Sequence, residues 1–413
     1  MVEAQAVPAA PAVPALPSAP ATPRPTRTED ARLRVRDWLA RTGRDGVVLG
    51  TPGGVAWITG GMNLPIDRTA GTDLVWAVVT AGSAALITTD IEADRIRDEM
   101  QPAAAGFDLL AVPWWRPEAF AAAALDLVDG ATDRLATDVD LGDPGTGVSL
   151  VTDELVELRL PLGAAEQDLI RALGFDAADA LQRALGNWRP GDTDHHVAAE
   201  VAAVLESRGA DAPVLIVGGD DRLLRYRHPL AVGAPMHRLA MAVVVARRSG
   251  LHVAATRFAS AGAVPEAMTQ SLVDAEHVDA AVLSACVPGA TYGGVLTALA
   301  RGYADVGQPE AWREHYQGGP IGYAQREFEL APGQSDSRWW ATRLAAGHAV
   351  AWNPSLAGGG KHEDTYLVSA SGLEPLTTAP GWPAMSAGAS SPITRRPAVL
   401  DIDSGAAALG RTP

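Results

Sequence analysis

Two histidines occur in settings that could support proton transfer. His315 begins a stretch, residues 315–327, that contains three glycines and a proline and follows neither a helical nor a strand period. Because glycine lets the backbone approach a ligand closely, this composition favours a cavity wall, although an ordinary surface loop has it too. His228 ends the sequence Arg-Tyr-Arg-His. Imidazole titrates near neutral pH, so either ring could be a general acid or base, or else a structural hydrogen-bond donor.

Cationic and polar residues accompany these histidines. Guanidinium groups bind a carboxylate through two parallel N–H groups, so the arginines suit the anionic part of a substrate. Glu363 follows Lys361 and His362, and this run could hold a histidine–glutamate pair or simply be a solvated charged segment. The candidate substrate-binding residues are Arg225, Arg227, Arg257, Tyr323, Arg326, Asn353 and Lys361.

Five short motifs follow one another in an order that resembles the creatinase/aminopeptidase P family, peptidase family M24. The motifs are two Pro-Gly helix starts at residues 190–193 and 288–291, the pattern His315-x-x-x-Gly319-x-x-Gly322, a strand ending at Asn353-Pro354, and the strand start Glu363-Asp364-Thr365. The resemblance covers about residues 30–375. It implies the pita-bread fold of that family.

The resemblance also implies where a metal centre would be, and most of its ligands are missing. Metallopeptidases of the family bind two metal ions through two Asp, one His and two Glu. Hard divalent ions need several carboxylate oxygens, and no Asp or Glu occurs between Arg238 and Gly262. We therefore expect no metal and no other cofactor. The matching positions here are Val243, Ala254, Gly319, Asn353 and Glu363.

The metal-free branch of the family, creatinase, offers a different assignment. Its general acid/base histidine matches His228, and a second histidine that contacts substrate matches His315. Together with Glu363 these residues are the predicted catalytic set, with no metal ligand among them. The carboxylates by which creatinase holds the guanidinium group of creatine fall on Thr256 and Asn353, so creatine is not the expected substrate.

The favoured hypothesis is a metal-independent hydrolase or lyase that breaks or rearranges a C–N bond of a small, polar, carboxylated molecule. One alternative is an inactive binding or regulatory protein that kept the fold. A second is a metallo-aminopeptidase of the Xaa-Pro type with rearranged ligands. The alanine- and arginine-rich composition is typical of a high-GC bacterium, in which such a gene would serve specialised metabolism.

Composition limits the possible partners. The formal charge of −16 argues against nucleic acid and against an anionic membrane surface. No apolar run reaches the roughly 18 residues that a membrane helix needs. Cys286 is the single cysteine of the 413 residues, which fits a reducing cytoplasm. A small-molecule substrate is the expected partner.

The elements that must position these residues predict an α+β protein. Residues 1–27, rich in alanine and proline, are expected to be a disordered tail. Short β-branched stretches, among them residues 46–50, 55–59, 74–80 and 84–88, alternate with helical patterns and predict an N-terminal creatinase-like α/β domain over residues 28–160. The resemblance implies that residues 161–380 form the pita-bread domain, a curved antiparallel sheet covered by helices. Residues 381–413 are expected to be a C-terminal tail.

The resemblance also predicts a homodimer. In the family the N-terminal domain serves dimer assembly, and its loops reach the active site of the partner. The loop of residues 61–73, with Asp67 and Arg68, is therefore a candidate lid. A solvated connector is the alternative.

Overall fold

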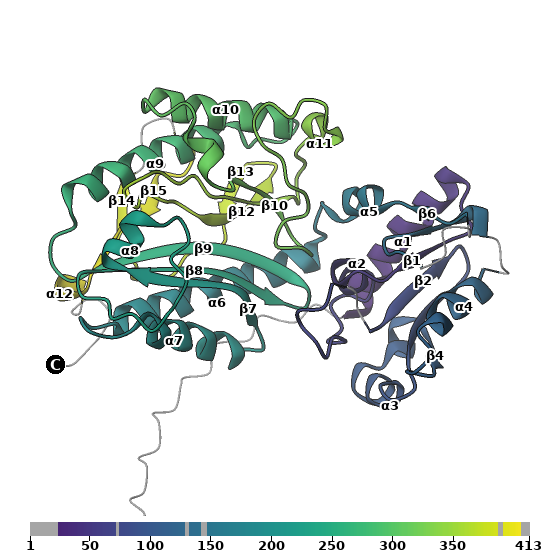
Figure 1. Ribbon diagram of the computed structural model, residues 1–413. Helices are drawn as coiled ribbons and strands as arrows, with labels where there is room; N and C mark the ends of the chain where they lie inside the picture. Colours follow the sequence, from purple (N-terminus) through teal and green to yellow (C-terminus); the bar gives the residue numbers. More distant parts are fainter. Residues whose placement is uncertain (1–23, 72–73, 129–131, 142–146, 387–390, 406–413) are drawn as a thin grey trace, which may run out of the picture.

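The computed structural model describes residues 24–71, 74–128, 132–141, 147–386 and 391–405, which form two lobes (Figure 1). The N-terminal lobe has a mixed sheet of order β4-β3-β2-β1-β5-β6, in which β1 pairs antiparallel with β2 and parallel with β5. Its strands are β1 (Gly46–Leu49), β2 (Trp76–Thr80), β3 (Ala84–Thr89), β4 (Asp108–Val112), β5 (Leu135–Thr137) and β6 (Ser149–Leu150). Its helices are α1 (Arg24–Thr42), α2 (Pro52–Ile58), α3 (Ala93–Arg95), α4 (Glu118–Asp126) and α5 (Thr152–Arg159).

Helices cover both faces of this sheet. Val47 and Leu49 of β1 pack with the apolar residues of α1, whereas Val48 packs in a second cluster with Ala124 of α4. Neighbouring strand residues point to opposite faces, so the fully buried β1 has to satisfy both helical layers. This is the layered arrangement that the alternation of strands and helices predicts.

Two local predictions for this lobe are wrong. Residues 55–58 lie in helix α2 and Thr59 caps its C-terminal end, whereas the sequence predicts a strand. Thr51 caps the N-terminal end by accepting a hydrogen bond from Gly54 N, and Pro52 starts the first turn. The expected tail extends too far, since α1 begins at Arg24 and Arg27 donates to the carbonyl of Gly60. Residues 1–23 lie outside the described residues.

The C-terminal lobe contains two four-stranded sheets, of order β16-β9-β8-β7 and β10-β11-β12-β13. They meet where Thr365 of β12 accepts a hydrogen bond from Ala254 N of β9 and donates one to its carbonyl. The strands are β7 (Asp211–Gly219), β8 (Leu239–Arg248), β9 (Leu251–Ser260), β10 (Gly318–Ile321), β11 (Ala349–Trp352), β12 (Asp364–Ser369) and β13 (Gly372–Pro375).

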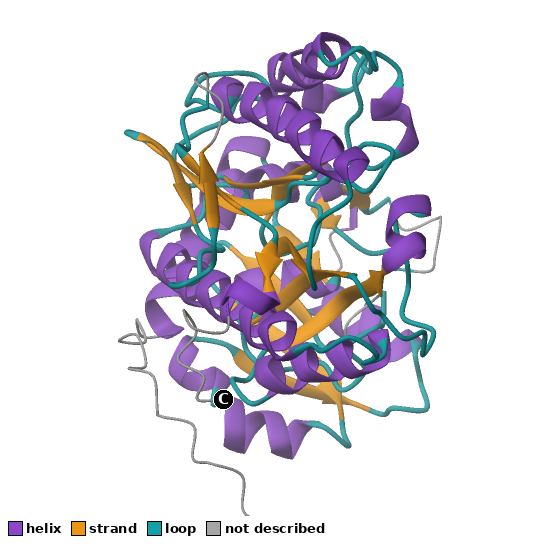
Figure 2. Ribbon diagram, turned by 90° about the vertical axis from the view of Figure 1, so that its left-hand side faces the viewer, coloured by secondary structure: helices purple, strands orange, loops and turns teal. Residues whose placement is uncertain are grey.

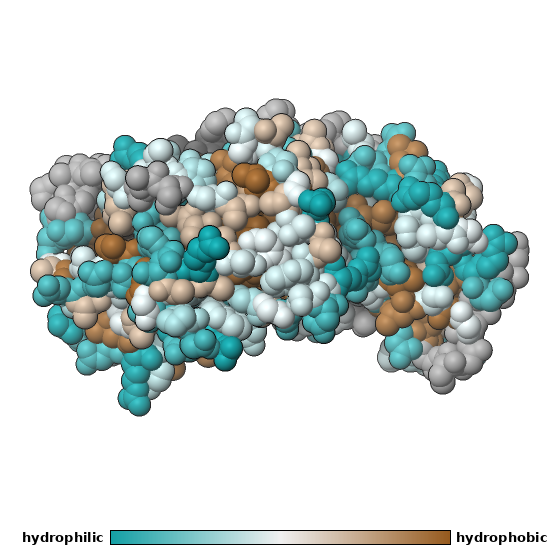
Figure 3. Space-filling view, turned by 90° about the horizontal axis from the view of Figure 1, so that it is seen from above, coloured by the Kyte–Doolittle hydropathy of each residue, from teal (hydrophilic) through white to brown (hydrophobic). Residues whose placement is uncertain are grey.

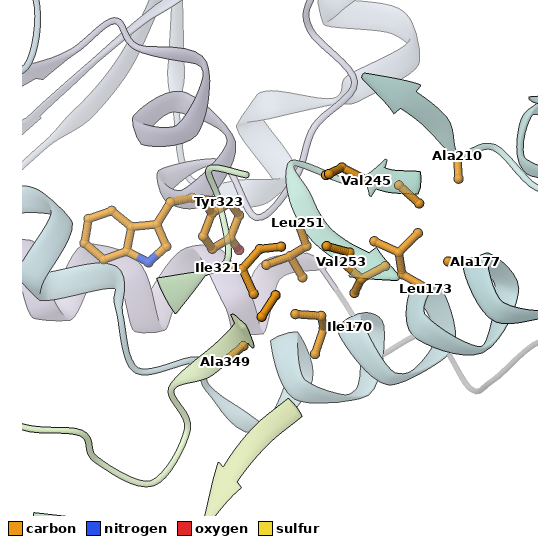
Figure 4. Packing of buried hydrophobic residues seen from close by; sticks show 14 of the residues in the cluster. Ile170, Leu173, Ala177, Ala210, Val245, Leu251, Val253, Ile321, Tyr323 and Ala349 are labelled. Atoms are coloured by element: carbon orange, nitrogen blue, oxygen red, sulfur yellow. The ribbon is translucent and has the colours of Figure 1, made fainter. Parts of the chain in front are cut away.

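Long helices lie on both sides of these sheets (Figures 1 and 2). Below β7–β9 in Figure 1 lie α6 (Ala164–Asn187) and α7 (Asp194–Glu206), and above them lie α9 (Glu266–Ala285) and α10 (Tyr292–Asp305). The short helices are α8 (Asp220–Arg225) and α11 (Arg338–Ala341). Figure 4 shows how Ile170 and Leu173 of α6 pack against Leu251 and Val253 of the β8–β9 hairpin.

The C-terminal segment is not the tail that the sequence predicts. It contains β14 (Ala384–Ser386), β15 (Arg395–Pro397), β16 (Leu400–Asp401) and α12 (Ile402–Gly405), and β16 pairs parallel with β9. Arg396 is only 2% exposed and forms ion pairs with Asp279 of α9 at 2.8 Å and with Asp364 of β12 at 3.3 Å. Two buried carboxylates far away in the sequence therefore hold this segment, and no local pattern encodes them.

Hydrophilic residues alternate with separate hydrophobic patches in the view of the molecule from above (Figure 3). Among the described helices, none combines the length and the apolar character that crossing a membrane requires.

One buried histidine should make folding sensitive to acid. His252 of β9 is 8% exposed, its Nδ1 lies 3.0 Å from the carbonyl oxygen of Gly322, and burial lowers its pKa to about 4. The unfolded chain binds a proton below the ordinary pKa of about 6.5, but the folded chain does so only near 4. The free energy of unfolding should therefore fall as the pH drops through this window, by about 2 kcal/mol from this group between pH 7 and pH 5.

Chemical denaturation at pH 7 and pH 5 checks this. His252→Gln, which can still donate to Gly322, should lose about 2 kcal/mol less than the wild type over that interval. His237→Gln, at an exposed position, is the control and should follow the wild type. Equal losses in the wild type and His252→Gln would contradict the prediction.

Candidate functional site

The structure brings the two histidines together. His228 follows α8, His315 follows a 3₁₀ turn at Ala311–Glu314, and their ring centroids are 4.7 Å apart. Both line a cavity of about 560 Å³, together with Trp312, Tyr316 and other residues. His228 is exposed, whereas Nε2 of His315 is buried and has no hydrogen-bond partner among the described residues. The cavity therefore offers one solvated imidazole and one buried, unpaired imidazole nitrogen.

Both imidazoles are held in the uncharged form. Burial lowers the pKa of His315 to about 2, with smaller contributions from the charges of Lys361, His228 and Arg227. Burial also lowers the pKa of His228, with a contribution from Lys361. A neutral imidazole has a free lone pair, so at neutral pH each ring can accept a hydrogen bond.

A neighbouring cavity of about 300 Å³ holds the cationic side chains. It is lined by Arg225, Arg227, Ser355 and Lys361, among others, and it shares Glu314 with the histidine cavity. Arg227 donates from Nη2 to Oε2 of Glu314 at 2.6 Å, and Glu314 lines both cavities. Arg225 is exposed and lies over the ring of Tyr226.

Glu363 lines a third cavity of about 200 Å³, and Lys361 lines both this one and the cationic cavity. The Glu363 carboxylate is 3% exposed and accepts a 2.7 Å hydrogen bond from Thr256 Oγ1. Met385 and residues 397–399 of the C-terminal segment form part of the same wall. The predicted catalytic set requires Glu363 to share the cavity of the two histidines, but the structure places it in a different cavity.

The positions that match family metal ligands carry little that could bind a metal. Val243 packs in an apolar cluster, and Asn353 Oδ1 is buried without a hydrogen-bond partner among the described residues. A Cβ at Gly319 would lie 3.8 Å from Cδ of Arg326, so the arginine occupies space beside this position. Within the described part of the chain, no group of three or more His, Cys, Asp or Glu could hold a metal ion. The residues present do not fit a two-metal centre.

Two predicted substrate-binding residues are bonded to carboxylates of their own chain. Arg257 is buried and bonds Asp364 Oδ1 at 2.7 Å as well as two backbone carbonyls, so its guanidinium is engaged within the core. Tyr323 donates from its hydroxyl to Glu166 Oε1 at 2.6 Å and packs in the core (Figure 4). Both side chains are therefore engaged with carboxylates of the same chain, and Arg257 also lines the cavity of Glu363.

The candidate lid contacts its own chain. Arg68 donates to Glu206 Oε1 of α7 at 2.6 Å, and Asp67 accepts hydrogen bonds from Thr69. The lid stays a prediction, because it concerns the pocket of a partner chain. Residues 72–73 of this loop lie outside the described residues.

Sequence reasoning missed two contributors to these cavities. Glu314 links Arg227 to the histidine cavity, and its place directly before His315 was an available signal. Met385 and residues 397–399, which cover the cavity of Glu363, had no such signal. Their position depends on the buried ion pairs of Arg396.

The fold is that of solved peptidase structures. Dipeptidase PepE from Mycobacterium ulcerans has a TM-score of 0.68 at 20% identity, covering 86% of this chain and 97% of that chain. Xaa-Pro dipeptidase from Bacillus anthracis has a TM-score of 0.67 at 17% identity, covering 86% and 98%. The N-terminal domain of FACT complex subunit SPT16 from Cicer arietinum (chickpea) has a TM-score of 0.60 at 13% identity, covering 86% and 96%.

Identities this low show the fold alone, and they confirm the predicted α+β pita-bread architecture. The sequence matches no protein-family model and no curated protein.

The C-terminal cover should depend on Arg396. Arg396→Met leaves Asp279 without its cationic partner in the core, so the free energy of unfolding should fall by about 3–5 kcal/mol. Chemical denaturation measures the change. Arg395→Met, at the exposed neighbouring position, is the matched control and should stay within about 0.5 kcal/mol of the wild type. Similar losses in the two variants would show that the buried ion pairs do not hold the segment.

Proposed function

We propose that this protein is a metal-independent enzyme that breaks or rearranges a C–N bond of a small, polar, carboxylated molecule. The observation that carries the proposal is the pair of uncharged imidazoles, 4.7 Å apart, on one cavity. Two neutral bases side by side suit a reaction in which one takes a proton from the attacking group and the other assists the leaving nitrogen.

The two histidines have different roles in this proposal. His315, whose buried Nε2 has no protein partner among the described residues, accepts a hydrogen bond or a proton from the substrate. His228 is exposed and can exchange its proton with solvent between turnovers. Arg227 binds the substrate carboxylate from the adjoining cavity, because its bond to Glu314 occupies Nη2 and leaves other N–H groups of its fork for an anion.

A ligand-binding protein without catalytic activity is the second candidate. The likeness to the N-terminal domain of a FACT complex subunit favours it, because this fold occurs in a domain named as part of a complex rather than as an enzyme. In either case we propose a cytoplasmic homodimer.

Metal independence has its own test. Elemental analysis of the purified protein should find substoichiometric Mn, Co, Zn and Fe, and EDTA should leave the melting temperature and any activity unchanged. The physical reason is the donor set, which offers one carboxylate and one amide at the five matched positions. One or more of these metals per chain would support the metallo-aminopeptidase alternative instead.

Proton transfer by His228 predicts a loss of turnover without a loss of stability. On any member of a panel of carboxylated amides, ureas and guanidino acids that the wild type cleaves, His228→Ala should lower kcat by about 10²–10⁴-fold. Its melting temperature should stay within a few degrees. His228→Asn, which keeps a hydrogen bond but cannot titrate near neutral pH, should be nearly as inactive.

His277→Ala, at an exposed position on α9, is the control and should retain full turnover. Unchanged kcat in His228→Ala would refute the acid/base role. Tight binding of panel members by the wild type with no cleavage of any would favour the ligand-binding candidate.

A further inference from the structure

Lys361 is the only lysine in the 413-residue sequence, which contains 33 lysines and arginines together. Elsewhere the chain uses arginine for its remaining basic side chains. The two residue types differ in one chemical respect that matters here: the guanidinium group stays protonated in proteins, whereas an amine can lose its proton and become a nucleophile. Lys361 is therefore the one basic side chain, apart from the histidines, that could lose its proton and act as a nucleophile.

The backbone fixes this position firmly. Ser355 and Lys361 form an isolated β-bridge, and the turn between them contains Gly358, Gly359 and Gly360. Gly360 lies against α9, where an added Cβ would come within 2.0 Å of the carbonyl oxygen of Ser271. The backbone N–H of Gly360 also donates a hydrogen bond to Ser271 Oγ of this helix, with 2.9 Å between the two atoms. The turn therefore presents Lys361 at one defined place.

The amine at that place has no protein partner. Lys361 is 3% exposed, and its Nζ forms no hydrogen bond with any described residue. The nearby Glu363 carboxylate instead accepts from Thr256, and no described carboxylate lies within ion-pair distance of Nζ. Burying an ammonium group without hydrogen bonds is costly, so burial lowers the pKa of Lys361, as does the charge of Arg227, while Glu363 opposes the shift.

Two cavities of about 300 and 200 Å³ lie beside this amine. The larger one is also lined by Arg227, whose guanidinium can bind a carboxylate. A small molecule in this cavity would meet an anion-binding group and an unpaired amine together.

We propose that Lys361 is a covalent catalytic residue that forms a Schiff base with the carbonyl carbon of a small oxo acid. Nζ attacks the carbonyl carbon, the new C–N bond forms, and the carbonyl π electrons move to the oxygen, which takes a proton. The carbinolamine then loses this oxygen as water while nitrogen loses its remaining protons, leaving an imine. One carbonyl and one amine become one imine and one water, with no oxidant or reductant.

The inference goes beyond the proposed C–N chemistry and does not depend on it. The neutral imidazoles of His228 and His315 could move protons during loss of water, but the covalent bond needs only Lys361. A non-covalent anion site at the same amine is the competing explanation, and the experiment must separate the two.

Reductive trapping with glyoxylate provides the test. The full-length folded protein is incubated at pH 7 with glyoxylate and sodium cyanoborohydride, and intact mass and peptide mapping locate the product. We expect one carboxymethyl group on Lys361, formed faster than in the denatured chain, because the lowered pKa raises the neutral fraction of the amine. Lys361→Arg, which keeps the charge, should lose this label entirely.

Three further measurements make the result decisive. Arg227→Gln should require a higher glyoxylate concentration for half-maximal labelling, whereas labelling by propionaldehyde, which has no carboxylate, should not change. His277→Ala, at an exposed position on α9, should still form the imine at the wild-type rate. Because glyoxylate has no C–N bond to cleave, a failed search for C–N cleavage leaves the inference standing. Three outcomes would each overturn the Schiff-base proposal. The folded protein could be labelled only at its N-terminal amine, or Lys361 could be labelled more slowly than in the denatured chain. Glyoxylate could also stabilise the protein without forming any adduct.

Discussion

The buried carboxylate of Asp364 connects the parts of the C-terminal lobe that form its cavities. Asp364 accepts from Arg257 of β9 and from Thr377, and it pairs with Arg396 of the C-terminal segment. Removing one charged partner from such a buried network leaves another charge unpaired, which costs far more than an exposed ion pair contributes. The network therefore holds β12, β9 and the C-terminal segment in register.

This register determines the chemistry next to it. Lys361 and Glu363 immediately precede Asp364, so their positions follow from the way β12 is held. Glu363 is satisfied by Thr256 across the junction of the two sheets, and Lys361 is left without a partner. A rigid core thus fixes one buried carboxylate with a hydrogen bond and one buried amine without any.

The centre of the curved sheet differs in electrostatic character from a metal site. Met241, Val243 and Phe258 form an apolar cluster with helix residues. Apolar side chains cannot supply the oxygen ligands that hard divalent ions need. The shared fold with dipeptidases therefore does not by itself transfer their chemistry to this chain.

The sequence by itself determined the architecture and the absence of carboxylates along the β8–β9 hairpin. The alternating patterns of the sequence and the spacing from His315 to Gly322 are local features. Such features can be read without knowing which distant residues come into contact. The nearness of His228 to His315 also followed from matching motifs, and the structure brings the two rings together.

Only the tertiary structure decided which polar side chains remain free. Arg257 and Tyr323 looked as suitable for binding as Arg227, yet their partners Asp364 and Glu166 lie 107 and 157 residues away. The same holds for Arg396, whose burial turned an expected tail into part of the core, and for Lys361, whose amine found no partner. Residue type and spacing determine what a side chain can bind, but whether it is already bound depends on contacts that only the folded chain creates.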